Sequence, residues 1–168
     1  LRANAESYNK TYIAGEPYPH VVIDDLFAPE MLDRIVNEFP SSGNRDWIAY
    51  DTQHELKSTS RGINGLSTFT QLFCLWLSSS EVINEIKKIT GLDNICADPM
   101  YHGAGLHEMY RDGWLEMHSD YTKHYHLPMV RRLNLITYLN RDWAEVWGGE
   151  LALQDYKDSS KQVSYAPH

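Results

Sequence analysis

Cysteines and long hydrophobic runs are both scarce in this chain, and each scarcity excludes a class of protein. Only Cys74 and Cys96 occur among 168 residues. We expect both to be reduced thiols, because two cysteines make no disulfide framework. The longest near-continuous apolar run, residues 72–77, is far shorter than the roughly 20 residues of a membrane-spanning helix. The sequence therefore predicts neither a disulfide-stapled secreted domain nor a membrane-spanning protein.

Basic residues are also few. The chain carries 15 Lys and Arg against 23 Asp and Glu, for a net charge of −8. This balance argues against a nucleic-acid or anionic-membrane partner, since both require a dominant basic surface. No charged and then apolar leader opens the chain, so we expect a cytoplasmic location. The length predicts one structural domain, and 11 Tyr, 5 Trp and 4 Phe argue against disorder.

The pattern of apolar residues changes near residue 98. Before that point it predicts a short strand and three helices, with a loop over 41–65 that contains one strand near 47–50. Pro29 is expected in the first turn of the first helix and Pro40 at its end. The predicted regular elements of this half are a strand at 20–24 and helices within 29–39, 66–77 and 80–90.

The second half shows short strand patterns separated by Gly, Asp, Asn and Pro. Such spacing is typical of a β-sandwich or barrel, and the absence of strand–helix alternation argues against a parallel sheet. The predicted strands are 106–111, 114–118, 133–139 and 150–154.

Histidines gather in the second half, where five of the eight fall between 102 and 126. Carboxylates are interspersed among them, which indicates a metal site. His118-Ser119-Asp120 is the sharpest candidate, because residues i and i+2 of a strand project from one face. An imidazole and a carboxylate at this spacing supply two of the three ligands of a non-haem Fe(II) facial triad.

The residues around this pair extend the pattern. Downstream lie the run Arg-Arg-Leu-Asn-Leu-Ile-Thr-Tyr-Leu-Asn at 131–140, then Trp143 and Trp-Gly-Gly-Glu-Leu at 147–151. Upstream lies Gly-Leu-His-Glu-Met-Tyr at 105–110, and the opening Tyr-Pro-His-Val-Val-Ile-Asp-Asp at 18–25 fits as well. Together these motifs resemble the 2-oxoglutarate- and Fe(II)-dependent oxygenases, in the prolyl 4-hydroxylase-like branch.

The resemblance implies a double-stranded β-helix, or jelly-roll, core at 98–168, preceded by a strand and helices at 1–97 that pack on it. It implies Fe(II) ligation by His118 and Asp120. Tyr138 is expected to reach the far carboxylate of 2-oxoglutarate, with Tyr110 and Asn134 beside the cosubstrate. The implied reaction consumes dioxygen and hydroxylates a peptide or small molecule, with prolyl 4-hydroxylation favoured, and ascorbate is left open as a further cofactor.

The family pattern also requires a distal histidine and, beyond it, an arginine or lysine. His168 lies too early for that histidine, so we expect the last barrel strands and both distal residues to be missing from this chain. Each candidate has an ordinary structural interpretation: Tyr138 as a packed tyrosine, Asn134 as a strand-edge residue, Arg131 and Arg132 as surface charges. Two alternatives stay open, a non-catalytic barrel module and a zinc site within the histidines of 107–126. The oligomeric state is not predicted.

Overall fold

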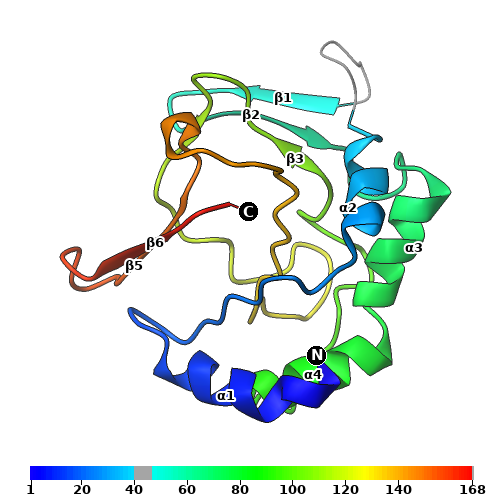
Figure 1. Cartoon of the computed structure of the whole chain (residues 1–168), viewed down its shortest axis with the longest axis vertical. Coiled ribbons are helices and arrows are strands. Elements are labelled where there is room, and N and C mark those ends of the chain that lie inside the picture. The colour runs from blue at the N-terminus through cyan, green and yellow to red at the C-terminus, as the bar shows by residue number, and fades with distance from the viewer. Residues whose placement is uncertain (40–46, 168) are drawn as a thin grey trace.

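Helices and two antiparallel sheets make up the fold, which is described here from a computed structural model for residues 1–39 and 47–167. Figure 1 shows the elements in chain order. The helices are η1 (Arg2–Asn4), α1 (Ala5–Ala14), α2 (Pro29–Val36), α3 (Thr68–Leu77), α4 (Ser80–Thr90) and η2 (Glu145–Trp147). The strands are β1 (Trp47–Asp51), β2 (Glu55–Ser60), β3 (His107–Glu108), β4 (Trp114–Leu115), β5 (Leu151–Gln154) and β6 (Gln162–Tyr165).

The predicted helices α3 and α4 are confirmed, and their ends follow from capping residues. Ser67 and Ser79 each accept a backbone N–H with the side-chain hydroxyl, which satisfies donors that a helix leaves free at its start. Gly91 ends α4 with φ at 72°, a left-handed conformation that suits glycine. The helix α1 was not expected; it lies against α4, where the Asn9 amide donates to the carbonyl of Ile89 at 2.8 Å.

The predicted helix that begins at Pro29 is confirmed as α2. It buries Ile35, which is 1% exposed, and ends at Val36, earlier than expected. The expected stop at Pro40 lies outside the described residues. The Glu38 carboxylate then accepts the backbone N–H of Ser67 at 3.0 Å and the Thr70 hydroxyl at 2.6 Å. These bonds tie the end of α2 to the start of α3.

One sheet contains strands from both halves of the chain. β1 and β2 form an antiparallel hairpin, from the Trp47–Ser60 pair to the Asp51–Leu56 pair. β2 also pairs with β3 and β4, so residues before and after 98 share the sheet. The second sheet is the antiparallel hairpin β5–β6. Strand pairing throughout the described residues is antiparallel, as expected, and these residues form no closed barrel.

Two predicted strands are wrong. Residues 20–24 and 133–139 form neither helix nor strand. Their apolar and β-branched composition suits a strand, but a strand also needs a hydrogen-bonded neighbour, and neither segment pairs with a described strand. The predicted strands at 106–111 and 114–118 shorten to two residues each, and β2 and β6 were not expected.

Figure 1 shows how these elements surround the irregular middle of the chain. The sheet of β1, β2 and β3 lies at one end, and α1 with α4 at the other. The helices α2 and α3 follow one side, the hairpin β5–β6 lies on the opposite side, and the segment after residue 130 runs between them. No helix in the described ranges is both long and apolar enough to cross a membrane.

Candidate metal centre

His118 and Asp120 lie side by side in the irregular segment that follows β4. The segment is anchored at Glu116, whose backbone N–H donates to the His54 carbonyl at 2.9 Å. The Glu116 carboxylate contacts Nδ1 of His54 at 2.6 Å. Because a carbonyl oxygen only accepts, Nδ1–H of His118 donates to the Glu116 carbonyl at 2.7 Å, which leaves the lone pair on Nε2. That Nε2 lies 3.7 Å from Oδ1 of Asp120.

The other oxygen of Asp120 is held by the segment after residue 130. Oδ2 accepts a short hydrogen bond from the side-chain amide of Asn134. Nε–H of Arg131 in turn donates to Oδ1 of Asn134 at 2.6 Å. Nη1 of Arg131 lies 3.5 Å from Oδ1 of Asp120, and the guanidinium stacks over the Tyr121 ring at 4.8 Å. Asp120 therefore sits in a connected polar network, while its side chain is still 38% exposed.

The structure does not join the two predicted cosubstrate tyrosines to this pair. Tyr138 is half-buried, and burial raises the pKa of its hydroxyl, so the group stays protonated and can donate. Tyr110 lies just after β3. A hydrogen bond from Ser58 lowers its pKa, but a hydrogen bond to Glu108, partial burial and the charge of that carboxylate outweigh it and raise the pKa. Within the described residues, no hydrogen bond or ion pair links either tyrosine to His118 or Asp120.

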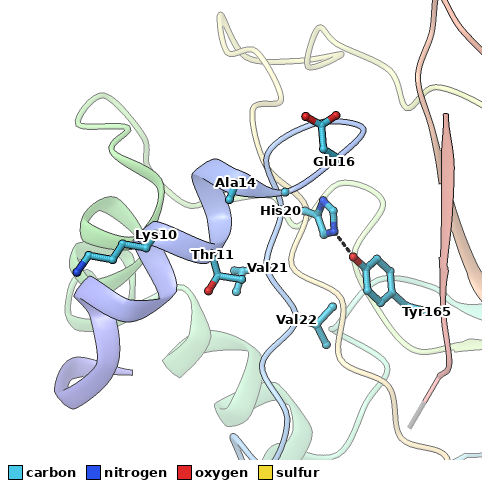
Figure 2. Close-up of a pocket in the computed structure, with 9 residues that line it drawn as sticks. Lys10, Thr11, Ala14, Glu16, His20, Val21, Val22 and Tyr165 are labelled. Atoms are coloured by element: carbon cyan, nitrogen blue, oxygen red, sulfur yellow. Dashed lines mark hydrogen bonds between the residues drawn. The ribbon is translucent and has the colours of Figure 1, made fainter.

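The charge of Asp120 also acts on Tyr18 in the N-terminal segment. Burial raises the pKa of Tyr18, and the nearby charge of Asp120 raises it further. Two residues later, Nδ1–H of His20 donates to the Tyr18 carbonyl at 2.8 Å, so Nε2 accepts the short hydrogen bond from the Tyr165 hydroxyl. Figure 2 shows this contact at the edge of an open cavity of about 610 Å³, between α1, the segment 20–22 and β6.

The His118–Asp120 pair fits a divalent metal ion on three counts. Metal-bound histidines commonly donate their second ring N–H to a carbonyl or carboxylate, as His118 does. With metal–ligand distances of about 2.1 Å, two donors up to about 4 Å apart can share one ion, and 3.7 Å lies within that limit. Imidazole with carboxylate is also the donor set that suits Fe(II). Among residues 1–39 and 47–167 no third His, Cys, Asp or Glu completes the group, and His168 lies outside them.

Three other histidines, His102, His124 and His126, gather elsewhere, while His107 lies in β3. Their arrangement gives the zinc hypothesis no support. The ring centroids of His102 lie 5.5 Å from those of His124 and 6.3 Å from those of His126. Nδ1 of His124 accepts two backbone N–H groups at 3.0 Å each, so the ring proton is on Nε2, which faces Asp98 at 3.4 Å. A protonated nitrogen has no lone pair for zinc.

One comparison with known proteins gives a family match to the second half of the chain. Residues 104–168 match the family model described as the 2OG-Fe(II) oxygenase superfamily, and this range contains both His118 and Asp120. The match supports a member of that superfamily and an oxygenase function in general, with Fe(II) and 2-oxoglutarate as the cofactors that such a family implies. No curated protein and no solved structure matches the chain.

Sequence reasoning missed Arg131 as a residue of the site. Arg131 was interpreted as a surface charge just before the strand predicted at 133–139, and in extended backbone residues i and i+3 point to opposite faces, so no contact with Asn134 was expected. In the irregular backbone that the structure shows, Arg131 and Asn134 instead meet. The available signal was an arginine three residues before a polar side chain in an otherwise apolar run.

Proposed function

We propose that this protein is a 2-oxoglutarate- and Fe(II)-dependent dioxygenase that hydroxylates an unactivated C–H bond. One observation carries the proposal: Nε2 of His118 keeps its lone pair free and faces Oδ1 of Asp120 at 3.7 Å. The two atoms are therefore already placed so that both can bind one metal ion. The family match over 104–168 supports the same chemistry.

Each residue has a distinct part in the proposal. His118 and Asp120 would hold Fe(II) through Nε2 and Oδ1, and the Glu116 carbonyl keeps the His118 ring in the required tautomer. Bound Fe(II) with 2-oxoglutarate would supply the activation of dioxygen that C–H hydroxylation requires. Tyr138 is proposed to donate its hydroxyl to the far carboxylate of 2-oxoglutarate, with Tyr110 and Asn134 lining the cosubstrate pocket.

The finer assignment is a prolyl 4-hydroxylase-type reaction on a peptide or small molecule. It is supported by the order of motifs around the metal pair, from 105–110 through 131–140 to 147–151. The same order supports a jelly-roll core for 98–168. Ascorbate as a further cofactor and a cytoplasmic location are also parts of the proposal. The net charge of −8 supports a partner other than nucleic acid or an anionic membrane.

An anaerobic titration of the full chain with Fe(II) and then 2-oxoglutarate tests the metal centre. We expect the weak visible charge-transfer band of an Fe(II)–2-oxoglutarate complex. The band should disappear in His118→Ala and Asp120→Ala and persist in His126→Ala, which removes an exposed histidine of the same segment. A band that survives His118→Ala would overturn the assignment of this ligand. Absence of a band both in the unaltered chain and in one extended at its C-terminus would favour the non-catalytic barrel module.

Turnover separates the substrate classes. The loaded protein is incubated with dioxygen, 2-oxoglutarate and either a proline-containing peptide or free proline, and succinate and hydroxyproline are measured. Succinate formed in step with hydroxyproline supports the prolyl assignment and shows which of the two is the substrate. Succinate without hydroxyproline on either substrate would overturn that assignment and retain the oxygenase class.

A further inference from the structure

The two oxygens of Asp120 have different surroundings. Oδ2 accepts the short hydrogen bond from Asn134. Oδ1 has two polar neighbours, Nε2 of His118 at 3.7 Å and Nη1 of Arg131 at 3.5 Å, and both distances exceed those of a normal hydrogen bond. One oxygen is thus occupied, while the other keeps its lone pairs and faces the histidine.

Arg131 determines which way the Asn134 amide points. A guanidinium N–H only donates, so the atom of Asn134 that it contacts must be the amide oxygen. The opposite end of the amide, the NH₂ group, is thereby directed at Asp120, where it donates to Oδ2. Stacking of the guanidinium on Tyr121 at 4.8 Å restrains the arginine side chain in turn.

We propose that Asn134, oriented by Arg131, is a positioning residue that makes Asp120 a one-oxygen metal ligand through Oδ1. The inference rests on the proposed metal centre and adds residues that no ligand motif contains. Asn134 occupies Oδ2 and prevents a two-oxygen binding mode. Arg131 acts one step further out, through Asn134, so neither residue touches the metal in this arrangement.

Charge and position predict opposite effects for the loss of Arg131. A guanidinium 3.5 Å from the carboxylate repels an incoming cation, so removal of its charge alone should strengthen metal binding. If Arg131 instead positions Asp120 through Asn134, its removal should weaken metal binding. Loss of groups that orient metal ligands typically costs roughly 10–100-fold in metal affinity. The sign of the change therefore distinguishes the two roles.

Titration of the full chain with Co(II), followed by visible absorption, shows whether loss of Arg131 raises or lowers the metal affinity. We expect Arg131→Met and Asn134→Ala to weaken Co(II) binding by about tenfold or more. Arg132→Met is the matched control, because it removes the same charge from the exposed neighbouring position. It should leave the affinity within about twofold of the unaltered chain. Arg131→Lys should fail to restore binding, since an ammonium lacks the planar fork of the guanidinium.

A second readout needs no metal. In ¹⁵N-labelled apoprotein, the Asn134 side-chain amide and the Arg131 Nε–H should give distinct, slowly exchanging signals. Asp120→Ala should shift the Asn134 signals, Asn134→Ala should remove protection of the Arg131 Nε–H, and Arg132→Met should change neither. Thermal melting of each variant identifies loss of fold, and Asn134→Ala replaces Arg131→Met as the test if only the latter melts early.

The outcomes separate the inference from the proposed function. Co(II) affinity that is unchanged or increased in Arg131→Met and Asn134→Ala would overturn the positioning role and leave the metal centre intact. If the Asn134 amide signals are unchanged in Asp120→Ala, the positioning role is overturned as well. A chain that binds neither Co(II) nor Fe(II) would overturn the metal centre itself, and the positioning role with it.

Discussion

The side-chain amide of Asn134 donates a hydrogen bond to the carboxylate of Asp120, across a sequence separation of 14 residues. Neither residue belongs to a helix or strand. The two irregular segments that carry them are joined by side-chain bonds and by the isolated bridge between Lys123 and Val130. The geometry of the candidate site therefore depends on polar side chains more than on a sheet ladder, and single substitutions should test it sharply.

Gly105→Ala should destabilise the fold by about 1–3 kcal/mol. Gly105 has φ at 146°, and a Cβ at this position would lie 2.4 Å from Oγ of Ser60. That hydroxyl holds the end of β2 to the next segment, because it accepts the Leu106 N–H at 3.0 Å. Urea unfolding measures the loss. Gly65→Ala is the control, since its Cβ would meet no atom within 4 Å; equal midpoints for the two variants would contradict the prediction.

The hydrogen bond between His20 and Tyr165 should appear as a coupling energy. In a double-mutant cycle of His20→Phe and Tyr165→Phe, we expect about 1 kcal/mol of coupling, because the two groups are direct partners. Thermal or urea unfolding supplies the four free energies of unfolding. Tyr156→Phe, at a side chain that is 94% exposed, should show no coupling to His20→Phe. Additive effects of His20→Phe and Tyr165→Phe would show that the contact contributes nothing to stability.

Asp98 should make stability depend on acid pH. Burial raises the pKa of Asp98, but hydrogen bonds from the Met100 and His102 N–H groups and the charges of nearby histidines outweigh burial and lower it. A carboxyl with a lowered folded-state pKa stabilises the fold above its unfolded value, near 3.8, and loses that contribution as pH falls through the folded value. Urea midpoints of the unaltered chain should therefore drop between about pH 5 and pH 3.

Asp98→Asn tests the source of that pH dependence. The variant should be less stable than the unaltered chain at pH 7, because the two backbone N–H groups donate to different oxygens of Asp98 at 2.8 Å, and the NH₂ group of Asn cannot accept the second bond. The gap between the two proteins should narrow towards pH 3. Asp93→Asn, at an exposed position in the preceding loop, should keep the pH profile of the unaltered chain. A gap that stays constant with pH would contradict the role assigned to the Asp98 charge.

Tyr138→Phe should weaken 2-oxoglutarate binding and leave Co(II) binding unchanged. A hydrogen bond to a charged group contributes about 1.5–3 kcal/mol, so the dissociation constant should rise by about 10-fold or more. Calorimetric titration of 2-oxoglutarate into the Co(II)-loaded chain measures it. Tyr125→Phe is the control at a side chain that is 69% exposed. Equal 2-oxoglutarate affinities in the two variants would remove Tyr138 from the cosubstrate pocket.

The helices α2, α3 and α4 were the most predictable part of the fold, whereas α1 was not predicted. Ser67, Ser79 and Gly91 carry local signals that fix where α3 and α4 begin and end, and these signals act within one turn of the chain. The segment 133–139 shows the opposite case. Its composition is that of a strand, but a strand forms only where another segment offers hydrogen bonds, and local sequence does not contain that information.

In the site, too, some features were predictable from local sequence and others depend on contacts with other segments. The nearness of His118 and Asp120 was predicted from the alternation of a strand, yet the two residues meet in irregular backbone after β4. The placement of Asn134 near the cosubstrate stays a prediction, and the bond that the structure gives it, to Asp120, was not foreseen. Arg131 reaches Asp120 because the irregular backbone after residue 130 brings its guanidinium beside that carboxylate, and the spacing of residues along a strand does not predict this contact.

The hydrogen bond between His20 and Tyr165 can form only late in the synthesis of the chain. It spans 145 residues, so translation delivers the histidine long before its partner. Contacts of such long range must close a large loop of chain, which makes them late and slow to form. The cavity wall between α1 and β6 therefore stays unfinished on the ribosome until Tyr165 has emerged. Until then the N-terminal segment of the nascent protein lacks the partner that closes this side of the cavity.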